Sequence, residues 1–127
     1  MEMESDKMNR MELEQFIQDN YNTEPDYPWI KFPNDAVYRH HNNKKWFALI
    51  MRVSKTKLGL QEEKLLDIVN FKCDPVLIGS LLGEKGFFPA YHMSKTNWIT
   101  VALDGSATDD KIKMLLDMSY DATAPRL

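Results

Sequence analysis

The chain has 127 residues, of which 43% are hydrophobic and 28% are charged, and its formal net charge is −3. This composition fits one globular domain and excludes a disordered chain, which would be poorer in apolar residues. The single cysteine excludes an internal disulfide, the absence of a long apolar run excludes a membrane span, and the acidic N-terminus is unlike a signal peptide, so we expect a cytoplasmic protein.

The N-terminal part predicts a short leader and then a helix. Residues 1–7 are expected to be disordered, and a single domain is expected over residues 8–124. Asn9 and Glu12 have the spacing of a capping box, in which each side chain bonds the other residue's backbone N–H. Apolar residues then follow at helical spacing, so the first helix is expected at about residues 9–20.

The next part of the chain favours strands. Prolines exclude a helix from residues 21–35, which we expect to be a connection. Residues 36–40 and 45–53 predict a β-hairpin, because two strand-like runs flank a short polar turn. A polar loop at 54–63 leads to a third strand at 65–72.

The C-terminal half predicts two helices and one more strand. Asp74 and Pro75 have the residue types of a helix N-cap and first helical position. An extended segment at 87–93 and a fourth strand at 97–103 follow, and Thr108 caps a last helix. The order predicts an α+β two-layer sandwich, with an antiparallel sheet covered on one face by the N- and C-terminal helices. The other face and the loops are left for function.

Charge is unevenly distributed along the chain. Residues 1–30 carry two basic and eight acidic side chains, residues 31–98 carry eleven and six, and residues 99–127 carry three and five. If the basic middle segment forms one face, the field there is positive although the whole chain is acidic.

The basic segment also holds aromatic and polar side chains, which together suggest a nucleic-acid surface. Lysine and arginine bind phosphates, and bases or sugars stack on tryptophan or histidine. The alternative is that the lysines solvate strand edges while Trp46 and Trp98 belong to the core. The candidate residues are Arg39, His40, Lys44, Lys45, Trp46, Asn70, Lys72, His92, Lys95, Asn97 and Trp98, of which Asn70 and Lys72 share a strand face and are expected to form an exposed polar patch.

Several sequence blocks occur in an order that resembles the MmcQ/YjbR family of bacterial proteins. They are Tyr27-Pro28-Trp29, Lys45-Trp46-Phe47-Ala48-Leu49-Ile50, Val69-Asn70-Phe71-Lys72-Cys73-Asp74-Pro75, Pro89-Ala90-Tyr91-His92-Met93-Ser94-Lys95, Asn97-Trp98, Leu103-Asp104-Gly105 and Ser119-Tyr120-Asp121. The resemblance implies a frataxin-like (CyaY-like) fold and DNA binding through a "double wing" arrangement of the sheet, a label that rests on analogy between folds. This chain has Ala90 where glycine is usual, a long loop at 54–64 and the extra residues 1–7.

Three further groups of residues have alternative interpretations. His92 and Lys95 could transfer protons, bind a ligand or only shape a loop. Cys73 could be a reactive thiol before a helix N-terminus or a small buried apolar residue. The acidic side chains Glu12, Glu14 and Asp19 of the first helix could bind metal, as in frataxins, or form a solvated face. No zinc site is expected, because no further His or Cys stands at ligand spacing from the three histidines.

The sequence therefore predicts a monomeric, non-enzymatic domain without a cofactor that binds DNA weakly and without strong sequence preference. One alternative is a small-ligand or protein interaction module that uses the Tyr91–Trp98 region, and another is frataxin-like metal binding. A discrete pocket around His92 and Trp98 would favour a small ligand, whereas a flat positive face would favour nucleic acid.

Overall fold

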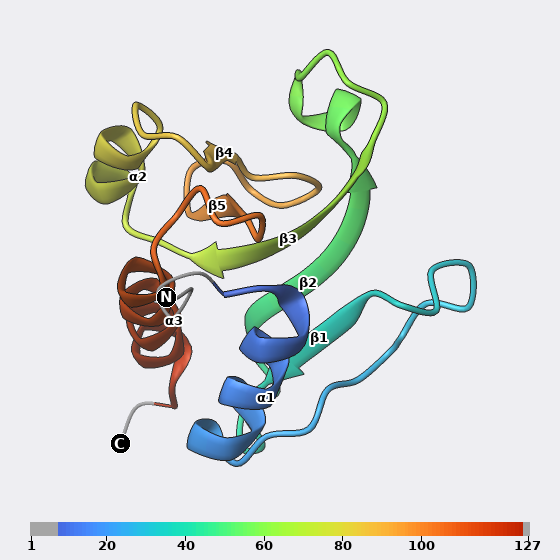
Figure 1. The fold of residues 1–127 in the computed structure, drawn as a ribbon. Coiled ribbons are helices and arrows are strands. Elements are labelled where there is room, and N and C mark those ends of the chain that lie inside the picture. Colours follow the sequence, from blue (N-terminus) through green and yellow to red (C-terminus); the bar gives the residue numbers. More distant parts are fainter. Residues whose placement is uncertain (1–7, 126–127) are drawn as a thin grey trace, which may run out of the picture.

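The computed structural model describes residues 8–125, so the leader predicted over residues 1–7 lies outside the described residues. The helices are α1 (Arg10–Tyr21), α2 (Pro75–Leu81) and α3 (Asp109–Thr123), with a 3-10 turn η1 (Lys55–Leu58), and the strands are β1 (Ala36–Arg39), β2 (Trp46–Ser54), β3 (Leu65–Lys72), β4 (Phe87–Pro89) and β5 (Trp98–Ala102). The expected α+β class is confirmed, and Figure 1 shows α1 and α3 against one side of the sheet.

The three helices begin at the predicted caps. Asn9 and Glu12 form the complete capping box of α1. The side chain of Asp74 accepts a hydrogen bond from the backbone of α2, and Thr108 does the same for α3. Each cap satisfies backbone N–H groups that the first helical turn leaves without partners, so these boundaries depend on a few neighbouring residues.

The five strands form one antiparallel sheet in the order β1-β2-β3-β5-β4. The predicted hairpin is confirmed as β1 and β2. The extended segment expected at 87–93 is shorter, because β4 ends at Pro89 and the chain turns through His92, whose φ is +59°. The loop expected at 54–63 contains η1, which Ser54 caps by accepting from the backbone of Thr56.

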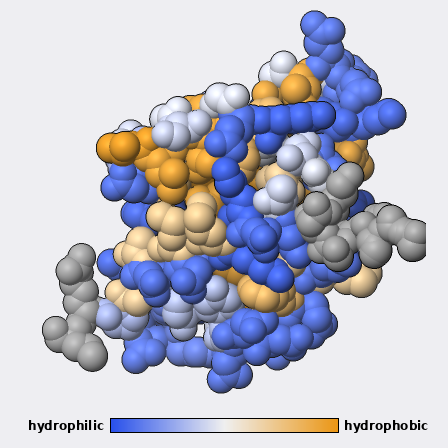
Figure 2. Space-filling model, turned by 60° about the vertical axis from the view of Figure 1, so that its left-hand side comes forward, coloured by the Kyte–Doolittle hydropathy of each residue, from blue (hydrophilic) through white to orange (hydrophobic). Residues whose placement is uncertain are grey.

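The terminal helices bury one face of the sheet, as the sequence predicted. Leu13 and Ile17 of α1 and Leu115 of α3 share one apolar cluster with Ile50 and Val69 of the central strands. This cluster is the main core. Figure 2 shows the side of the molecule that carries α2 and α3, where an apolar patch adjoins largely hydrophilic surface, and the most exposed apolar side chain of α2 is Val76.

The second face of the sheet is also apolar, but no α-helix of residues 8–125 covers it (Figure 1). Its buried residues form a separate cluster, against which Leu58 of η1 and side chains from two loops pack. One loop is the α1–β1 connection, which contributes Trp29, and the other is the β4–β5 connection, which contributes Tyr91 and Met93. The buried members are Val37, Leu49, Met51, Val53, Leu66, Ile68 and Ala102. We call this side the second face below.

No helix among residues 8–125 is long and apolar enough to cross a membrane.

Candidate ligand pocket on the second face of the sheet

The two loops do not close over the second face, and a cavity of about 610 Å³ lies between them. Leu49, Met51 and Val53 of β2 form its apolar floor. These three residues alternate along β2, so the pleat of the strand points all of them to the same face. The other lining residues are Trp29, Phe32, Asp35, Trp46, Arg52, Ser54, Lys57, Tyr91, His92 and Met93. We call this cavity the aromatic pocket.

One wall of the aromatic pocket is a pair of tryptophans. Trp29 and Trp46 meet edge to face, with ring centroids 5.8 Å apart and planes at 83°. This geometry is favourable, because the positive edge of one ring meets the negative face of the other. The loop that carries Trp29 is fixed to β1 by two backbone hydrogen bonds between Asp26 and Val37, of 2.8 and 2.9 Å.

The opposite wall is the β4–β5 connection, which side chains hold against the sheet. The backbone N–H of Tyr91 donates to the Thr100 hydroxyl at 2.9 Å, and its carbonyl accepts from the Asn70 amide at 3.5 Å. Lys95 adds a bond from its ammonium group to the carbonyl of Ala90 at 2.9 Å. Tyr91 and His92 then stack with ring centroids 3.9 Å apart and an interplanar angle of 15°.

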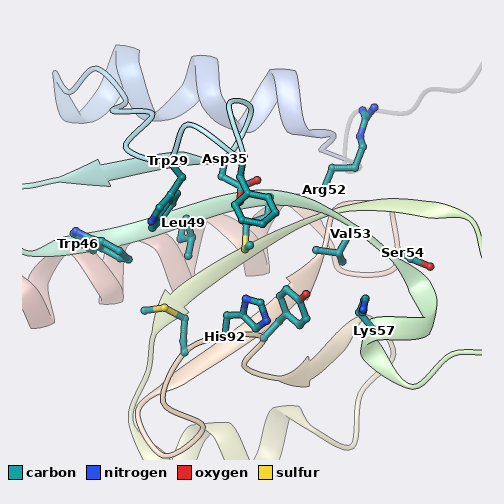
Figure 3. Close-up of a pocket in the computed structure, with 13 residues that line it drawn as sticks. Trp29, Asp35, Trp46, Leu49, Arg52, Val53, Ser54, Lys57 and His92 are labelled. Carbon is teal, nitrogen blue, oxygen red and sulfur yellow. The ribbon is translucent and has the colours of Figure 1, made fainter.

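The polar groups of the aromatic pocket lie at separate places around it. Figure 3 shows Asp35 on the upper wall above His92, the tryptophans at one end, and Ser54 and Lys57 at the other. Burial raises the pKa of Asp35 above its ordinary value, although the positive charges of Arg10 and His92 oppose that rise. Arg52 points away from the cavity in Figure 3 and pairs with Asp67 at 2.9 Å.

Sequence reasoning found part of this pocket. Trp46 and His92, which the sequence indicated as nucleic-acid contacts, both line the aromatic pocket. The region Tyr91–Trp98, predicted as a pocket, contributes its first residues but not Trp98. Trp29 and Asp35 were missed, because they lie in an irregular connection where no hydrophobic period indicates which side chains point inward. The block Tyr27-Pro28-Trp29 was the one available signal, since it contributed to the family resemblance.

Three of the predicted contact residues, His40, Asn70 and Trp98, are wrong as surface positions, because they are buried. His40 packs between the rings of Phe47 and Tyr120, and its Nε2 lies 3.0 Å from the Tyr120 carbonyl oxygen. Asn70 is fully buried on the second face, so the exposed patch expected there does not form. Its amide is engaged within the protein, where a polar side chain needs hydrogen-bond partners to offset the loss of water.

The strand register gathers another part of the predicted set in a row. Arg39 of β1 is paired with Trp46 of β2, and Lys72 of β3 is paired with Trp98 of β5. Trp98 is buried, and the Lys72 ammonium lies 5.8 Å from the centroid of its indole. Arg39 pairs with Asp26 at 2.6 Å. We call Arg39, Trp46, Lys72 and Trp98 the basic row.

The remaining candidates lie beside these two features. Lys44 and Lys45 are exposed in the β1–β2 turn, and no salt bridge to either occurs among the described residues. Asn97 is partly buried, and its carbonyl accepts from the backbone of Cys73 at 2.7 Å. A second, more polar cavity of about 420 Å³ lies beside this turn and includes His41 and Lys44.

The structure bears on two further alternatives, a reactive Cys73 thiol and frataxin-like metal binding. Cys73 is buried, and that burial raises the pKa of its thiol, which is the behaviour of a small apolar residue and not of an activated nucleophile. Among residues 8–125, no group of three or more His, Cys, Asp or Glu side chains is arranged to hold a metal ion.

The sequence profile of the YjbR family matches residues 7–122. The chain belongs to the YjbR family. This membership confirms the resemblance drawn from the sequence blocks. A curated relative, "Uncharacterized protein YyaQ" of Bacillus subtilis (strain 168), is 39% identical over 116 residues, which cover 91% of this chain and 98% of the relative.

Solved structures of similar proteins share the fold. A crystal structure of a Pseudomonas syringae protein, 43% identical in sequence, superposes with a TM-score of 0.90 and covers 92% of this chain and 100% of its own. A Deinococcus radiodurans protein, 21% identical, gives a TM-score of 0.67 over 89% of this chain and 76% of its own, and so shares the fold alone.

Proposed function

We propose that this chain is a binding module that takes a small, largely apolar ligand into the aromatic pocket. Its volume of about 610 Å³ is within the ~300–1,000 Å³ typical of small-ligand sites. Its lining also has the usual composition of such sites, an apolar and aromatic surface with a few polar groups at fixed places. The proposal is one of binding and not of catalysis.

The observation that carries this proposal is that both walls of the pocket are fixed by bonds outside the cavity. The backbone of Tyr91 is held through Thr100 and Asn70, and the loop of Trp29 is held through the backbone pair of Asp26 and Val37. A pocket whose walls are positioned in advance loses little conformational entropy when a ligand enters. Loops that only covered an apolar sheet face would have no need to leave a cavity there.

The three tryptophans provide a direct test. We expect ligand fragments found by saturation-transfer NMR to shift the indole N–H resonances of Trp29 and Trp46, which line the pocket. Trp98 does not line it and serves as an internal control. Fragments that shift no indole, or that shift only the Trp98 resonance, would contradict the proposal.

A second candidate function is weak DNA binding, and the basic row favours it. Cations alternate with tryptophans across four neighbouring strands, and Lys44 and Lys45 extend this charge into the adjacent turn. Phosphate contacts from lysine and stacking on aromatic rings are the two interactions that bind single strands without sequence preference. Trp98 is buried and Arg39 is paired with Asp26, so neither side chain is free to contact DNA. For this reason we place ligand binding in the aromatic pocket before DNA binding.

The DNA proposal is tested by fluorescence anisotropy of labelled single- and double-stranded DNA at increasing salt. We expect affinity to fall steeply with salt, and charge reversal at Lys44, Lys45, Lys72 and Lys95 to abolish binding. The matched control reverses four lysines elsewhere, Lys31, Lys57, Lys64 and Lys85. Equal loss in both variants would show that only net charge matters, and no binding at low salt would remove this candidate.

A further inference from the structure

We infer that the aromatic pocket selects an organic cation, an amine or quaternary ammonium group on an apolar body, with the Asp35 carboxylate as its counter-ion. This inference rests on the proposed ligand-binding function and names the class of ligand. Three observations carry it: a carboxylate without a partner among the described residues, aromatic rings that line the same cavity, and the contacts that Arg10 already makes elsewhere.

Asp35 differs from the other buried polar side chains of residues 8–125. Residues 8–125 contain seven buried polar or charged side chains, and six of them make a side-chain hydrogen bond. Asp35 is 8% exposed, and its carboxylate has no hydrogen-bond or ion-pair partner within the same residues. A buried charge without a partner is costly, so one that is retained in a cavity is a candidate for ligand binding.

The Asp35 oxygens keep access to the cavity. In the described part of the chain, one side-chain oxygen or nitrogen atom is both fully enclosed and without a hydrogen-bond partner. That atom is Oδ1 of Asp109 and does not belong to Asp35. Asp35 lines the aromatic pocket, and Figure 3 shows it on the wall that faces His92. A ligand group inside the pocket could therefore meet this carboxylate directly.

The aromatic rings favour a positive charge over a neutral polar group. Trp29, Trp46 and Tyr91 line the same cavity as Asp35. The face of an aromatic ring is negative, and indole faces bind cations most strongly, as in the aromatic cages that hold quaternary ammonium groups. A cavity lined by both a carboxylate and several such rings attracts an organic cation by two mechanisms, whereas an anion would be repelled by both.

The protein's own cations near Asp35 do not fill this role. Arg10 acts on the Asp35 charge from outside, but its guanidinium bonds Glu14 at 2.8 Å and also bonds the Asn34 carbonyl. His92 lies across the pocket from Asp35, and its ring stacks on Tyr91. Lys57 lies at the end of the pocket opposite the tryptophans. With the cationic head of a ligand at Asp35, its apolar body would lie over the apolar floor that β2 provides.

A matched pair of probes tests the inference. Benzyltrimethylammonium and 1-phenyl-2-methyl-2-propanol have similar size and shape, but only the first is charged. At pH 8 we expect the cation to bind at least about tenfold more tightly than the alcohol, by titration of the Trp29 and Trp46 indole resonances. Asp35→Asn should remove that difference and keep binding of the alcohol. Asp110→Asn, which changes the net charge equally at an exposed site, should keep the difference.

The possible outcomes separate this inference from the proposed function. Equal affinities for the two probes, or a preference that survives Asp35→Asn, would overturn the cation inference and leave the pocket as a site for neutral ligands. If neither probe binds and the fragment screen also fails, both proposals fall. If Asp35→Asn does not fold, the ¹³C carboxylate resonance of Asp35 in the unaltered protein decides: the cation should shift it and the alcohol should not.

Discussion

Thr100 donates its side-chain hydroxyl to the side-chain oxygen of Asn70, directly across the pairing of β3 and β5. The same hydroxyl accepts the backbone N–H of Tyr91, and the Asn70 amide donates to the Tyr91 carbonyl. Two buried polar residues on an otherwise apolar face thus satisfy each other and fix the loop that presents Tyr91 and His92. The wall of the aromatic pocket depends on this pair.

A double-mutant cycle should detect the coupling between these two residues. Asn70→Ala and Thr100→Val should each lower the free energy of unfolding by about 1–3 kcal/mol, because each leaves a buried polar group without its partner. The double variant should cost less than the sum, since the second change removes a group that is already unsatisfied. Urea denaturation measures the cycle, with Asn42→Ala in an exposed turn as control. Strict additivity would show that the two side chains act independently.

The Ser119 hydroxyl joins β2 and β3 where their backbone pairing stops, and its removal should lower the free energy of unfolding. The pairing of β2 with β3 stops at Ala48 and Phe71, beside the irregularity at Phe47. The Ser119 hydroxyl accepts the backbone N–H of Lys72 at 2.9 Å and donates to the Phe47 carbonyl at 2.7 Å. Because Ser119→Ala would leave both backbone groups unpaired, we expect a loss of about 2 kcal/mol in unfolding free energy.

The matched control for Ser119 is Ser80→Ala on α2, where the side chain is exposed. It should change stability by less than about 0.5 kcal/mol. Thermal unfolding followed by circular dichroism compares the two variants. A Ser119→Ala protein as stable as the control would mean that the strands rearrange to pair Phe47 and Lys72 without the hydroxyl.

The fold was largely predictable because its signals are local. The caps at Asn9, Asp74 and Thr108 act within a few residues, and the apolar periods of the helices and strands need no knowledge of distant contacts. The loops over the second face were not predictable, since their positions depend on pairs such as Asp26 with Val37 that no local pattern indicates.

The candidate site was predicted only in part, for a related reason. An asparagine in a strand suggests an exposed position, but Asn70 is buried because Thr100, thirty residues later, supplies its partner. The charges summed over residues 31–98 likewise include Arg39 as an available cation, although Asp26, outside that segment, pairs with it. Asp35 gave no signal at all, because an isolated acidic residue in a turn normally faces water.

The burial of His40 should make stability depend on pH. Removal from water lowers the pKa of His40 below its ordinary value, an effect that the hydrogen bond to the Tyr120 carbonyl partly opposes and the charge of His41 increases. The unfolded chain then binds the proton more readily than the folded one, so stability is full above about pH 6.5 and falls as the pH decreases below that value.

Denaturant titrations at several pH values between 8 and 5 measure this effect. His40→Gln should lower stability at pH 8 by about 1–2 kcal/mol, because the packing against Phe47 and Tyr120 is lost. It should also flatten the decline toward pH 5, whereas His41→Gln at the exposed neighbour should retain most of it. A decline that persists unchanged in His40→Gln would assign the pH dependence to another group.

The Asp35 carboxylate should destabilise the protein at neutral pH, in keeping with a ligand site. Burial raises the pKa of Asp35, so the folded state binds this proton more tightly than the unfolded chain does. The resulting stabilisation is present at low pH and is lost as the pH rises through the raised pKa. Asp35→Asn keeps the shape of the side chain without its charge, and it should therefore increase stability at pH 7, on the order of 1 kcal/mol.

Urea denaturation of the Asp35→Asn variant at pH 7 and at pH 4 tests the sign. The gain should shrink at pH 4, because the acid of the unaltered protein then becomes protonated and neutral as well. Asp110→Asn serves as control, since Asp110 is exposed in the first turn of α3 and its charge is favourable there. A loss of stability in Asp35→Asn at pH 7 would mean that Arg10 already stabilises the carboxylate, and a carboxylate neutralised in this way would not hold a ligand cation. A gain in stability together with a loss of cation binding would show that the fold keeps an unfavourable charge for the sake of its ligand, as functional sites commonly do.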